Sequence, residues 1–343
     1  MVGALVLALA AAVGARAEEV GRPVVLSPHA TPGARFMGIR FHGALALAPR
    51  VVDGITLGGL SGLAWDEDEG LLYAVSDRGS IFHLRPRIED GTLVGVEAVA
   101  AHRLRDQRGR ALRGRAADAE ALAMRDPPNG KRGDSRLVVS YEGFPRVTEH
   151  FPDGRYRGVR PLPAHLGHPG AYASGNQALE AMTMHPRMGT LVAPERPLAG
   201  ESADVVPITS LAGEEWTYRL FPYANASLVD MATLADGSLL TLERAYGPLY
   251  FPLVISLRHV AWPFDAKPLR VDTYAVLDSS RGFDIDNFEG VALHRDNHVF
   301  LVSDDNFHPL QRTLLVYLEL VQAGAVESIF DVPDGFDAET AEH

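Results

Sequence analysis

The stretch Glu289–Asp304, EGVALHRDNHVFLVSD, contains two short apolar runs with a polar turn between them. The first run begins with an acidic residue, the second ends with one, and Asp296-Asn297 lies between them. Apolar runs of this length joined by an Asp or Asn turn are typical of a β-hairpin. In an antiparallel hairpin the start of the first strand lies beside the end of the second. The stretch therefore predicts two strands whose acidic ends share one end of the hairpin.

The same pattern occurs in four earlier places, at intervals of 50 to 60 residues. The first runs begin at Ser61, Glu120, Glu180, Asp230 and Glu289, and the second runs end at Asp77, Glu142, Glu195, Glu243 and Asp304. A sheet unit that repeats with this period indicates a β-propeller, whereas a β-sandwich with accidental similarity is the alternative. We therefore predict an all-β protein, a β-propeller with five visible repeats and five or six blades. The run Phe36–Leu47 is expected to supply the last strand of the final unit and close the ring.

The composition excludes several classes of protein. The chain has 343 residues, 44 acidic and 32 basic side chains, a formal net charge of −12 and no Cys. Disulfide scaffolds, Cys-ligated zinc and thiol nucleophiles are therefore ruled out. A chain this acidic is a poor partner for nucleic acid, because the phosphate backbone selects basic surfaces.

The N-terminus resembles a secretory signal peptide. An apolar run over Val2–Gly14 precedes the small-x-small sequence Ala15-Arg16-Ala17, although no basic segment comes before the run. A single membrane anchor is the alternative, but the run is shorter than the roughly 20 apolar residues that a span needs. We expect an exported monomer, periplasmic or secreted, without stable membrane insertion. The expected organisation is a signal peptide (1–17), an N-terminal extension (18–35), one propeller domain (36–330) and a C-terminal tail (331–343).

The repeat predicts a cluster of carboxylates. The innermost strands of a propeller line its channel, and equivalent strand ends share one face. Ten positions are therefore expected near one mouth, and nine of them are acidic. Crowded carboxylates need cations or protons, and oxygen ligands in this number suit Ca²⁺. The predicted metal ligands are Asp77, Glu120, Glu142, Glu180, Glu195, Asp230, Glu243, Glu289, Asp304 and Asp305.

Two features of this cluster remain open at the level of sequence. In the last unit, the acid Asp304 comes one residue earlier than Glu142 does in its own unit. Either Asp304 or Asp305 is therefore the equivalent of Glu142. The choice matters because a one-residue slip turns a side chain to the other face of a strand. These acids could equally cap strand ends, pair with the neighbouring Arg or hold one structural ion. Arg78, Arg196 and Arg244 each directly follow an acid. We assign no catalytic side chain.

The ordered series of motifs resembles the phytase-like family of exported bacterial proteins with esterase-like activity. The resemblance runs from about Gly58 to Leu320; its marks include Gly59-Leu60-Ser61-Gly62-Leu63, Glu120-Ala121-Leu122, Leu242-Glu243-Arg244, Asn287-Phe288-Glu289-Gly290 and Val302-Ser303-Asp304-Asp305-Asn306. It implies kinship with β-propeller phytases, which hold Ca²⁺ with clustered carboxylates and use it to bind phosphate and activate water. Those enzymes also use basic residues to hold phosphate, and Lys occurs here only at Lys131 and Lys267. The resemblance therefore implies that Arg78, Arg196 and Arg244 bind substrate in its place, because Arg grips phosphate bidentately.

Two functions of different classes follow. The first is a Ca²⁺-dependent hydrolase that acts on small phosphate or carboxylate esters through metal-activated water at the propeller mouth. The alternative is a non-catalytic propeller that binds a ligand or a partner and holds a structural calcium ion. A fold alone does not decide between them, because propellers carry many functions.

Overall fold

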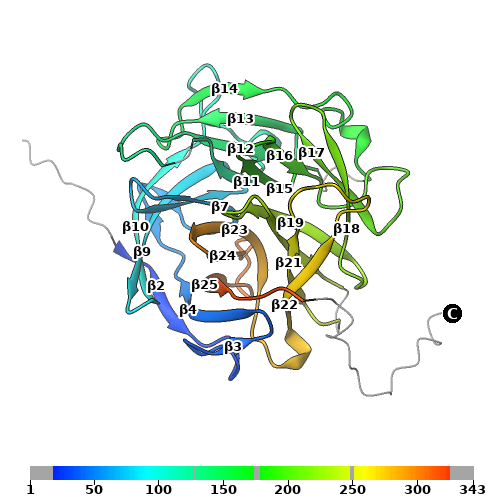
Figure 1. Ribbon diagram of the computed structural model, residues 1–343. Helices are drawn as coiled ribbons and strands as arrows, with labels where there is room; N and C mark the ends of the chain where they lie inside the picture. The colour runs from blue at the N-terminus through cyan, green and yellow to red at the C-terminus, as the bar shows by residue number, and fades with distance from the viewer. Residues whose placement is uncertain (1–17, 127, 174–177, 248–250, 325–343) are drawn as a thin grey trace, which may run out of the picture.

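The computed structural model describes residues 18–126, 128–173, 178–247 and 251–324, which form five antiparallel sheets arranged as blades around a channel (Figure 1). Each innermost strand contacts the innermost strands on both sides, and the last contacts the first, so the ring is closed. These strands are β7 (Leu60–Asp66), β11 (Ala119–Met124), β15 (Ala181–His185), β19 (Ala226–Thr233) and β23 (Asn287–Arg295). The predicted all-β propeller is confirmed, with five blades.

Each blade adds its strands outward from the channel in chain order. Blade 1 continues with β8 (Leu71–Ser76), β9 (Ser80–Glu89) and β10 (Thr92–Arg103); blade 2 with β12 (Leu137–Tyr141), β13 (Arg146–His150) and β14 (Tyr156–Arg160); blade 3 with β16 (Gly189–Ala193), β17 (Val205–Ser210) and β18 (Glu215–Arg219); blade 4 with β20 (Leu239–Ala245), β21 (Val254–Val260) and β22 (Val271–Asp278); and blade 5 with β24 (His298–Asp304) and β25 (Thr313–Leu320). Outside these sheets lie the hairpin β5 (Val51–Val52) and β6 (Ile55–Thr56), and the single 3₁₀ turns Gly114–Ala116, Pro169–Ala171 and Ser279–Arg281.

The two ends of the chain meet in blade 5. Strand β4 (Ile39–Leu47) pairs with β25, and in Figure 1 the blue strand lies beside the red one. The predicted closure by the run Phe36–Leu47 is therefore confirmed, and β3 (Arg35–Phe36) turns back onto the start of β4. The segment ahead of this run adds outer strands, because β1 (Glu18–Glu19) pairs with β10 and β2 (Gly21–Val24) pairs with β4.

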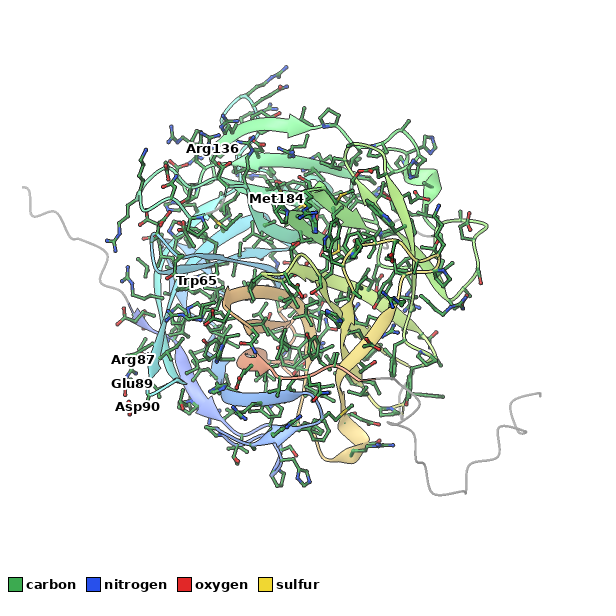
Figure 2. All side chains as sticks on the ribbon, viewed as in Figure 1. Trp65, Arg87, Glu89, Asp90, Arg136 and Met184 are labelled. Carbon is green, nitrogen blue, oxygen red and sulfur yellow. The ribbon has the colours of Figure 1, made fainter. Side chains whose placement is uncertain are left out.

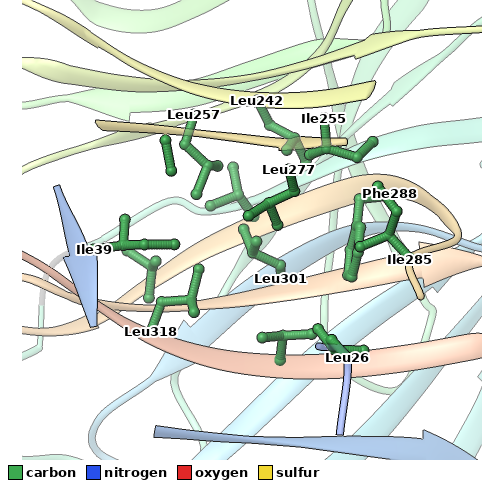
Figure 3. Close-up of a cluster of buried hydrophobic side chains, with 14 of the residues drawn as sticks. Leu26, Ile39, Leu242, Ile255, Leu257, Leu277, Ile285, Phe288, Leu301 and Leu318 are labelled. Carbon is green, nitrogen blue, oxygen red and sulfur yellow. The ribbon is translucent and has the colours of Figure 1, made fainter. Parts of the chain in front are cut away.

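Five apolar clusters form the core, one between each pair of neighbouring blades. The alternation of side chains along a strand lets the two faces of one blade serve two clusters. In β24, Leu301 packs toward blade 4, where Figure 3 shows it beside Leu277 and Ile285, whereas Phe300 packs toward blade 1. No helix among the described residues is long and apolar enough to span a membrane. The predicted signal peptide and tail lie outside the described residues.

Neighbouring inner strands approach closely around the channel. At Gly62 of β7, a Cβ atom would lie 2.7 Å from both the carbonyl oxygen of Glu120 and the backbone nitrogen of Leu122 in β11. Both contacts are with backbone, which cannot move aside as a flexible side chain can. Gly62 is therefore required for the contact between blades 1 and 2.

We predict that Gly62→Ala lowers the free energy of unfolding by about 1–3 kcal/mol, because it overpacks this contact. Gly158→Ala in the outer strand β14 is the matched control, since no atom lies within 4 Å of the added Cβ. It should change stability by less than about 0.5 kcal/mol. Urea denaturation of both variants measures the difference, and equal stabilities would contradict the close approach.

Candidate functional site

The mouth of the channel is the end at which the five inner strands begin. Four inner strands carry a β-bulge there, and a bulge turns side chains out of the regular alternation. The extra residues are Ser61 in β7, Glu120 and Ala121 in β11, Val229 in β19 and Glu289 in β23. Glu180 stands directly before the start of β15. Three of the five innermost strands therefore bring a glutamate to this end of the channel.

The ends of the second strands supply a further layer of acids. The backbone nitrogen of Glu142 donates to the carbonyl oxygen of Asp118 at 3.0 Å, two residues before Glu120. Equivalent pairings place Asp77 opposite Gly59, Glu195 opposite Ala178 and Asp304 opposite Asn287. Asp304 is thus the equivalent of Glu142. The neighbouring Asp305 accepts hydrogen bonds from the backbone nitrogens of Gly59 at 2.9 Å and Phe307 at 3.0 Å.

Blade 4 departs from this pattern by one residue. Its bulge is at Val229, so Asp230 takes the position that Gly62 holds in blade 1. The Asp230 carboxylate accepts backbone N–H groups from Val291 and Met231, each at 2.8 Å, and burial raises its pKa well above the usual range. Asp230 therefore ties blade 4 to blade 5, and the structure does not bring it to the other carboxylates.

The same offset turns Glu243 away from the channel and Arg244 toward it. Arg244 pairs with Ser227, which lies two residues before Val229. Arg244 therefore occupies the position that Asp77, Glu142, Glu195 and Asp304 hold in the other blades. Glu243 faces the opposite side of its strand, as a one-residue shift requires. There it accepts hydrogen bonds from Phe221 N at 2.7 Å, Arg258 Nη1 at 2.9 Å and the Tyr218 hydroxyl. These contacts join blades 3 and 4.

Eight carboxyl groups gather at the mouth, and each raises the pKa of at least one of the others or has its own raised by them. Asp305 also raises the pKa of Asp304, but we leave it out of the cluster because it is bonded to the backbone of Gly59 and Phe307. One of the eight, Asp118, was not predicted from the sequence. Ligand atoms of Asp118, Glu120 and Glu142 all lie within 4.8 Å of one another. The cluster, which we call the mouth carboxylates, consists of Asp77, Asp118, Glu120, Glu142, Glu180, Glu195, Glu289 and Asp304.

Burial and mutual repulsion keep several of these groups protonated. Burial raises the pKa of Asp77 to about 6, of Glu142 to about 7 and of Asp304 to about 8. The pKa values of Glu120 and Glu180 are raised well above the usual range, first by burial and then by neighbouring carboxylates. A hydrogen bond between the side chains of Glu142 and Glu180 lowers the pKa of Glu142 in part. Several of the mouth carboxyl groups therefore carry protons, which a bound cation could displace.

Arg244 is the cation that the chain itself supplies to the mouth. Its guanidinium donates to Glu195 Oε1 at 3.1 Å and also to Glu289 and the amide oxygen of Asn287, and the carboxylates of Glu289 and Glu195 raise its pKa. Of the other arginines predicted to bind substrate, Arg78 lies over the ring of Phe307 at 3.3 Å, and the buried Nε of Arg196 has no hydrogen-bond partner among the described residues. Among the described residues, only Arg244 forms ion pairs with the mouth carboxylates.

The donor set fits a hard divalent cation. The mouth offers carboxylate oxygens and one amide, and its members include no His, which matches the preference of Ca²⁺ for oxygen ligands. The Ser61 hydroxyl, only 2% exposed, adds an oxygen with no hydrogen-bond partner among the described residues. Asp118, Glu120 and Glu142, which converge most closely, are the best candidates for direct ligands.

The other end of the channel has different chemistry. A hollow of 1120 Å³ opens there, lined by Trp65, Met184 and Arg136 among others, and Figure 2 labels these three side chains. The adjoining channel is lined by Leu, Met, Ala and Thr side chains from all five inner strands. The hollow has acidic residues of its own, which are separate from the mouth carboxylates: Asp66, Glu67, Asp68, Asp126 and Asp134.

A five-bladed propeller with a carboxylate-lined mouth is the class that these observations define. A family model described as phytase-like, with the esterase-like activity of phytase, matches residues 55–307. The chain therefore belongs to the phytase-like family. No curated protein matches its sequence.

Solved structures similar to the chain also include propellers. An aldose sugar dehydrogenase from Streptomyces coelicolor, in its PQQ-bound form, is 11% identical with a TM-score of 0.41, over 80% of this chain and 97% of that one. The β-propeller domain of Cps50 (Swd1) from Myceliophteria thermophila is 12% identical with a TM-score of 0.36, over 88% and 99% of the two chains. A glucose dehydrogenase is 14% identical with a TM-score of 0.34, over 81% and 91%. At these scores the similarities carry no argument about substrate or cofactor.

The raised pKa values predict an unusual dependence of stability on pH. Unfolded carboxyls titrate near pH 4, whereas Asp77, Glu142 and Asp304 titrate at about 6, 7 and 8 in the folded protein. The folded state therefore binds more protons in this window, and stability falls as the pH rises through it. Without divalent cations, the free energy of unfolding should decrease from about pH 5 to about pH 8, by about 1.4 kcal/mol per pH unit for each extra proton.

Urea denaturation in chelator across this pH range measures the slope. Adding Ca²⁺ should restore stability at the upper end and have little effect at the lower end, where protons already neutralise the carboxylates. The double variant Asp77→Asn, Glu142→Gln should flatten the slope. A stability that rises with pH in chelator would contradict the account.

We also predict that Arg244→Met costs about 3–5 kcal/mol in chelator at about pH 8, because it leaves buried carboxylates without their counter-charge. The loss should shrink at low pH or with Ca²⁺. Arg219→Met is the control, since Arg219 pairs with Asp204 on the surface with both side chains about half exposed. That pair is worth about 0–1 kcal/mol. Thermal and urea unfolding compare the two, and equal losses would show that Arg244 has no special role.

Proposed function

We propose that the protein is an exported, Ca²⁺-dependent hydrolase of small phosphate or carboxylate esters, acting at the mouth of the propeller. The observation that carries the proposal is the gathering of eight carboxyl groups around one guanidinium, with three ligand atoms inside 4.8 Å. Membership of the phytase-like family supports the same reaction class. A structural role alone would not need so many unpaired acids, because a single carboxylate suffices to join two blades, as Glu243 does through Tyr218 and Phe221.

The residues of the mouth have distinct parts in this proposal. Asp118, Glu120 and Glu142 would hold the cation, and Asp77 and Glu180 lie close enough to Glu120 for their charges to interact with it. When bound, Ca²⁺ supplies Lewis-acid chemistry, since it neutralises charge on the ester and makes water more acidic. Burial of the mouth carboxylates would exclude water from around the ion, which strengthens electrostatic interactions with the ester.

The side chains around the mouth would orient the ester and move protons. Arg196 has an unpartnered Nε for a phosphate or carboxylate oxygen, and Arg78 is held in place by its contact with Phe307. Arg244 keeps its charge and fixes Glu195 and Glu289 in position. Asp304, whose pKa burial raises to about 8, is suited to hold a proton and give it to a leaving group.

The test is hydrolysis of p-nitrophenyl phosphate, p-nitrophenyl carboxylate esters and inositol hexakisphosphate with Ca²⁺ or EDTA. We predict that the double variant Glu120→Gln, Glu142→Gln lowers Ca²⁺-dependent turnover by about 100-fold or more, because two ligands lose their charge. Glu214→Gln, at an exposed position far from the mouth, should leave turnover unchanged. Circular dichroism checks that each variant is folded.

Two other outcomes would decide against the proposal. Activity that neither EDTA nor the double variant changes would exclude the metal mechanism. A rise in Tm with Ca²⁺ but no turnover on any of these substrates would favour a non-catalytic binding propeller with a structural ion.

A further inference from the structure

Three ligand-type side chains meet on one face of blade 5, away from the mouth. His298 of β24 pairs directly with Glu319 of β25, and Glu319 pairs with Arg40 of β4. His42 follows Arg40 by two residues and so lies on the same face of the sheet. The three adjacent strands thus place His42, Glu319 and His298 side by side, with each of the three partly exposed.

The distances are close to those of a metal site. One ligand atom from each of the three residues lies within 4.8 Å of the other two. His42 Nε2 is 3.4 Å from Glu319 Oε2, and the ring centroids of His42 and His298 are 5.1 Å apart. A zinc ion binds imidazole nitrogen and carboxylate oxygen at about 2.0–2.2 Å. Rotation of partly exposed side chains, without movement of the strands, is enough to close the remaining gap.

Two further observations point to a bound group. The Nδ1 atom of His298 is buried and has no hydrogen-bond partner among the described residues. Glu319 is bonded only through Oε2, to His42 and to Arg40 Nη1 at 2.8 Å, so Oε1 is uncommitted in the described chain. Arg40 is 41% exposed and can leave for solvent when a cation replaces it.

The surroundings hold the histidines in place. The ring of Tyr317 packs against His42 and His298, with centroids 5.9 and 5.4 Å away. The hydroxyl of Tyr317 is itself bonded to His294 Nδ1 at 2.7 Å, which fixes the orientation of the ring. A rigid aromatic wall behind two imidazoles limits how far they can turn.

We propose that His42, His298 and Glu319 bind a first-row divalent cation of the zinc type. Imidazole nitrogen selects such ions over Ca²⁺, whereas the mouth carboxylates favour Ca²⁺. The two sites therefore take different metals. Three protein ligands leave one coordination position for water. Because β4 comes from the N-terminal part of the chain and β24 and β25 from the C-terminal part, the ion would cross-link the strands that close the ring.

The test uses the full chain without a histidine tag, with excess Ca²⁺ present to fill the mouth. Isothermal titration with Zn²⁺ should give one site, and Co²⁺ should give the visible absorption of a nitrogen-ligated ion. The double variant His42→Ala, His298→Ala should weaken Zn²⁺ binding by about 100-fold or more and lose the Co²⁺ band. Zn²⁺ should raise the Tm of the wild type but not of this variant.

The control is His165→Ala. His165 also contacts a glutamate, Glu215 at 3.1 Å, but within the described part of the chain the two belong to no cluster of three ligand-type side chains. This variant should bind Zn²⁺ as the wild type does. If the double variant fails to fold, His298→Gln keeps the bulk of the side chain and should show the same loss. Failure of the wild type to bind Zn²⁺, or equal binding by the double variant, would overturn the proposal.

Discussion

Repulsion among the mouth carboxylates is the constraint on which the chemistry of this propeller depends. Their backbone is held by ladder hydrogen bonds, such as that from Glu142 to Asp118, and by bulges in four inner strands. These bonds form whatever the charge of the side chains. The fold therefore places acids together at a cost that protons, Arg244 and a metal ion can each offset.

The closed ring makes this arrangement rigid. Five apolar clusters fill the spaces between the blades, and β4 completes blade 5 beside β25. Neighbouring inner strands lie so close together that a Cβ atom at Gly62 of β7 would clash with the backbone of β11. The carboxyl groups at the strand ends cannot spread apart without breaking these contacts. The crowding of carboxyl groups at the mouth thus follows from packing between the blades.

The sequence predicted the propeller because its hairpin repeats, and it predicted the acids of four blades because their spacing is regular. Blade 4 was the exception. Its repeat was aligned on Asp230 and Glu243, but the bulge at Val229 moves the register by one residue, which turns Arg244 inward and Glu243 outward. No local pattern marks a bulge, so pairing between strands decides it. Asp118 was missed, although it precedes Glu120 by two residues as Asn287 precedes Glu289.

The pairing of His42 with His298 and Glu319 had no signal in the sequence, because these residues come from opposite ends of the chain. Their meeting depends on β4 crossing to blade 5, and on the register in which it pairs with β25. Closure itself was predictable from the run Phe36–Leu47, whereas the side chains it brings together were not.

The central claim is that the mouth carboxylates form a site for a hard divalent cation. A crystal structure of the protein soaked in Ca²⁺ tests it most directly, through anomalous difference density. The account predicts a peak bounded by Asp118, Glu120 and Glu142, with oxygen ligands at about 2.3–2.6 Å. A mouth that shows only water at saturating Ca²⁺ would contradict it.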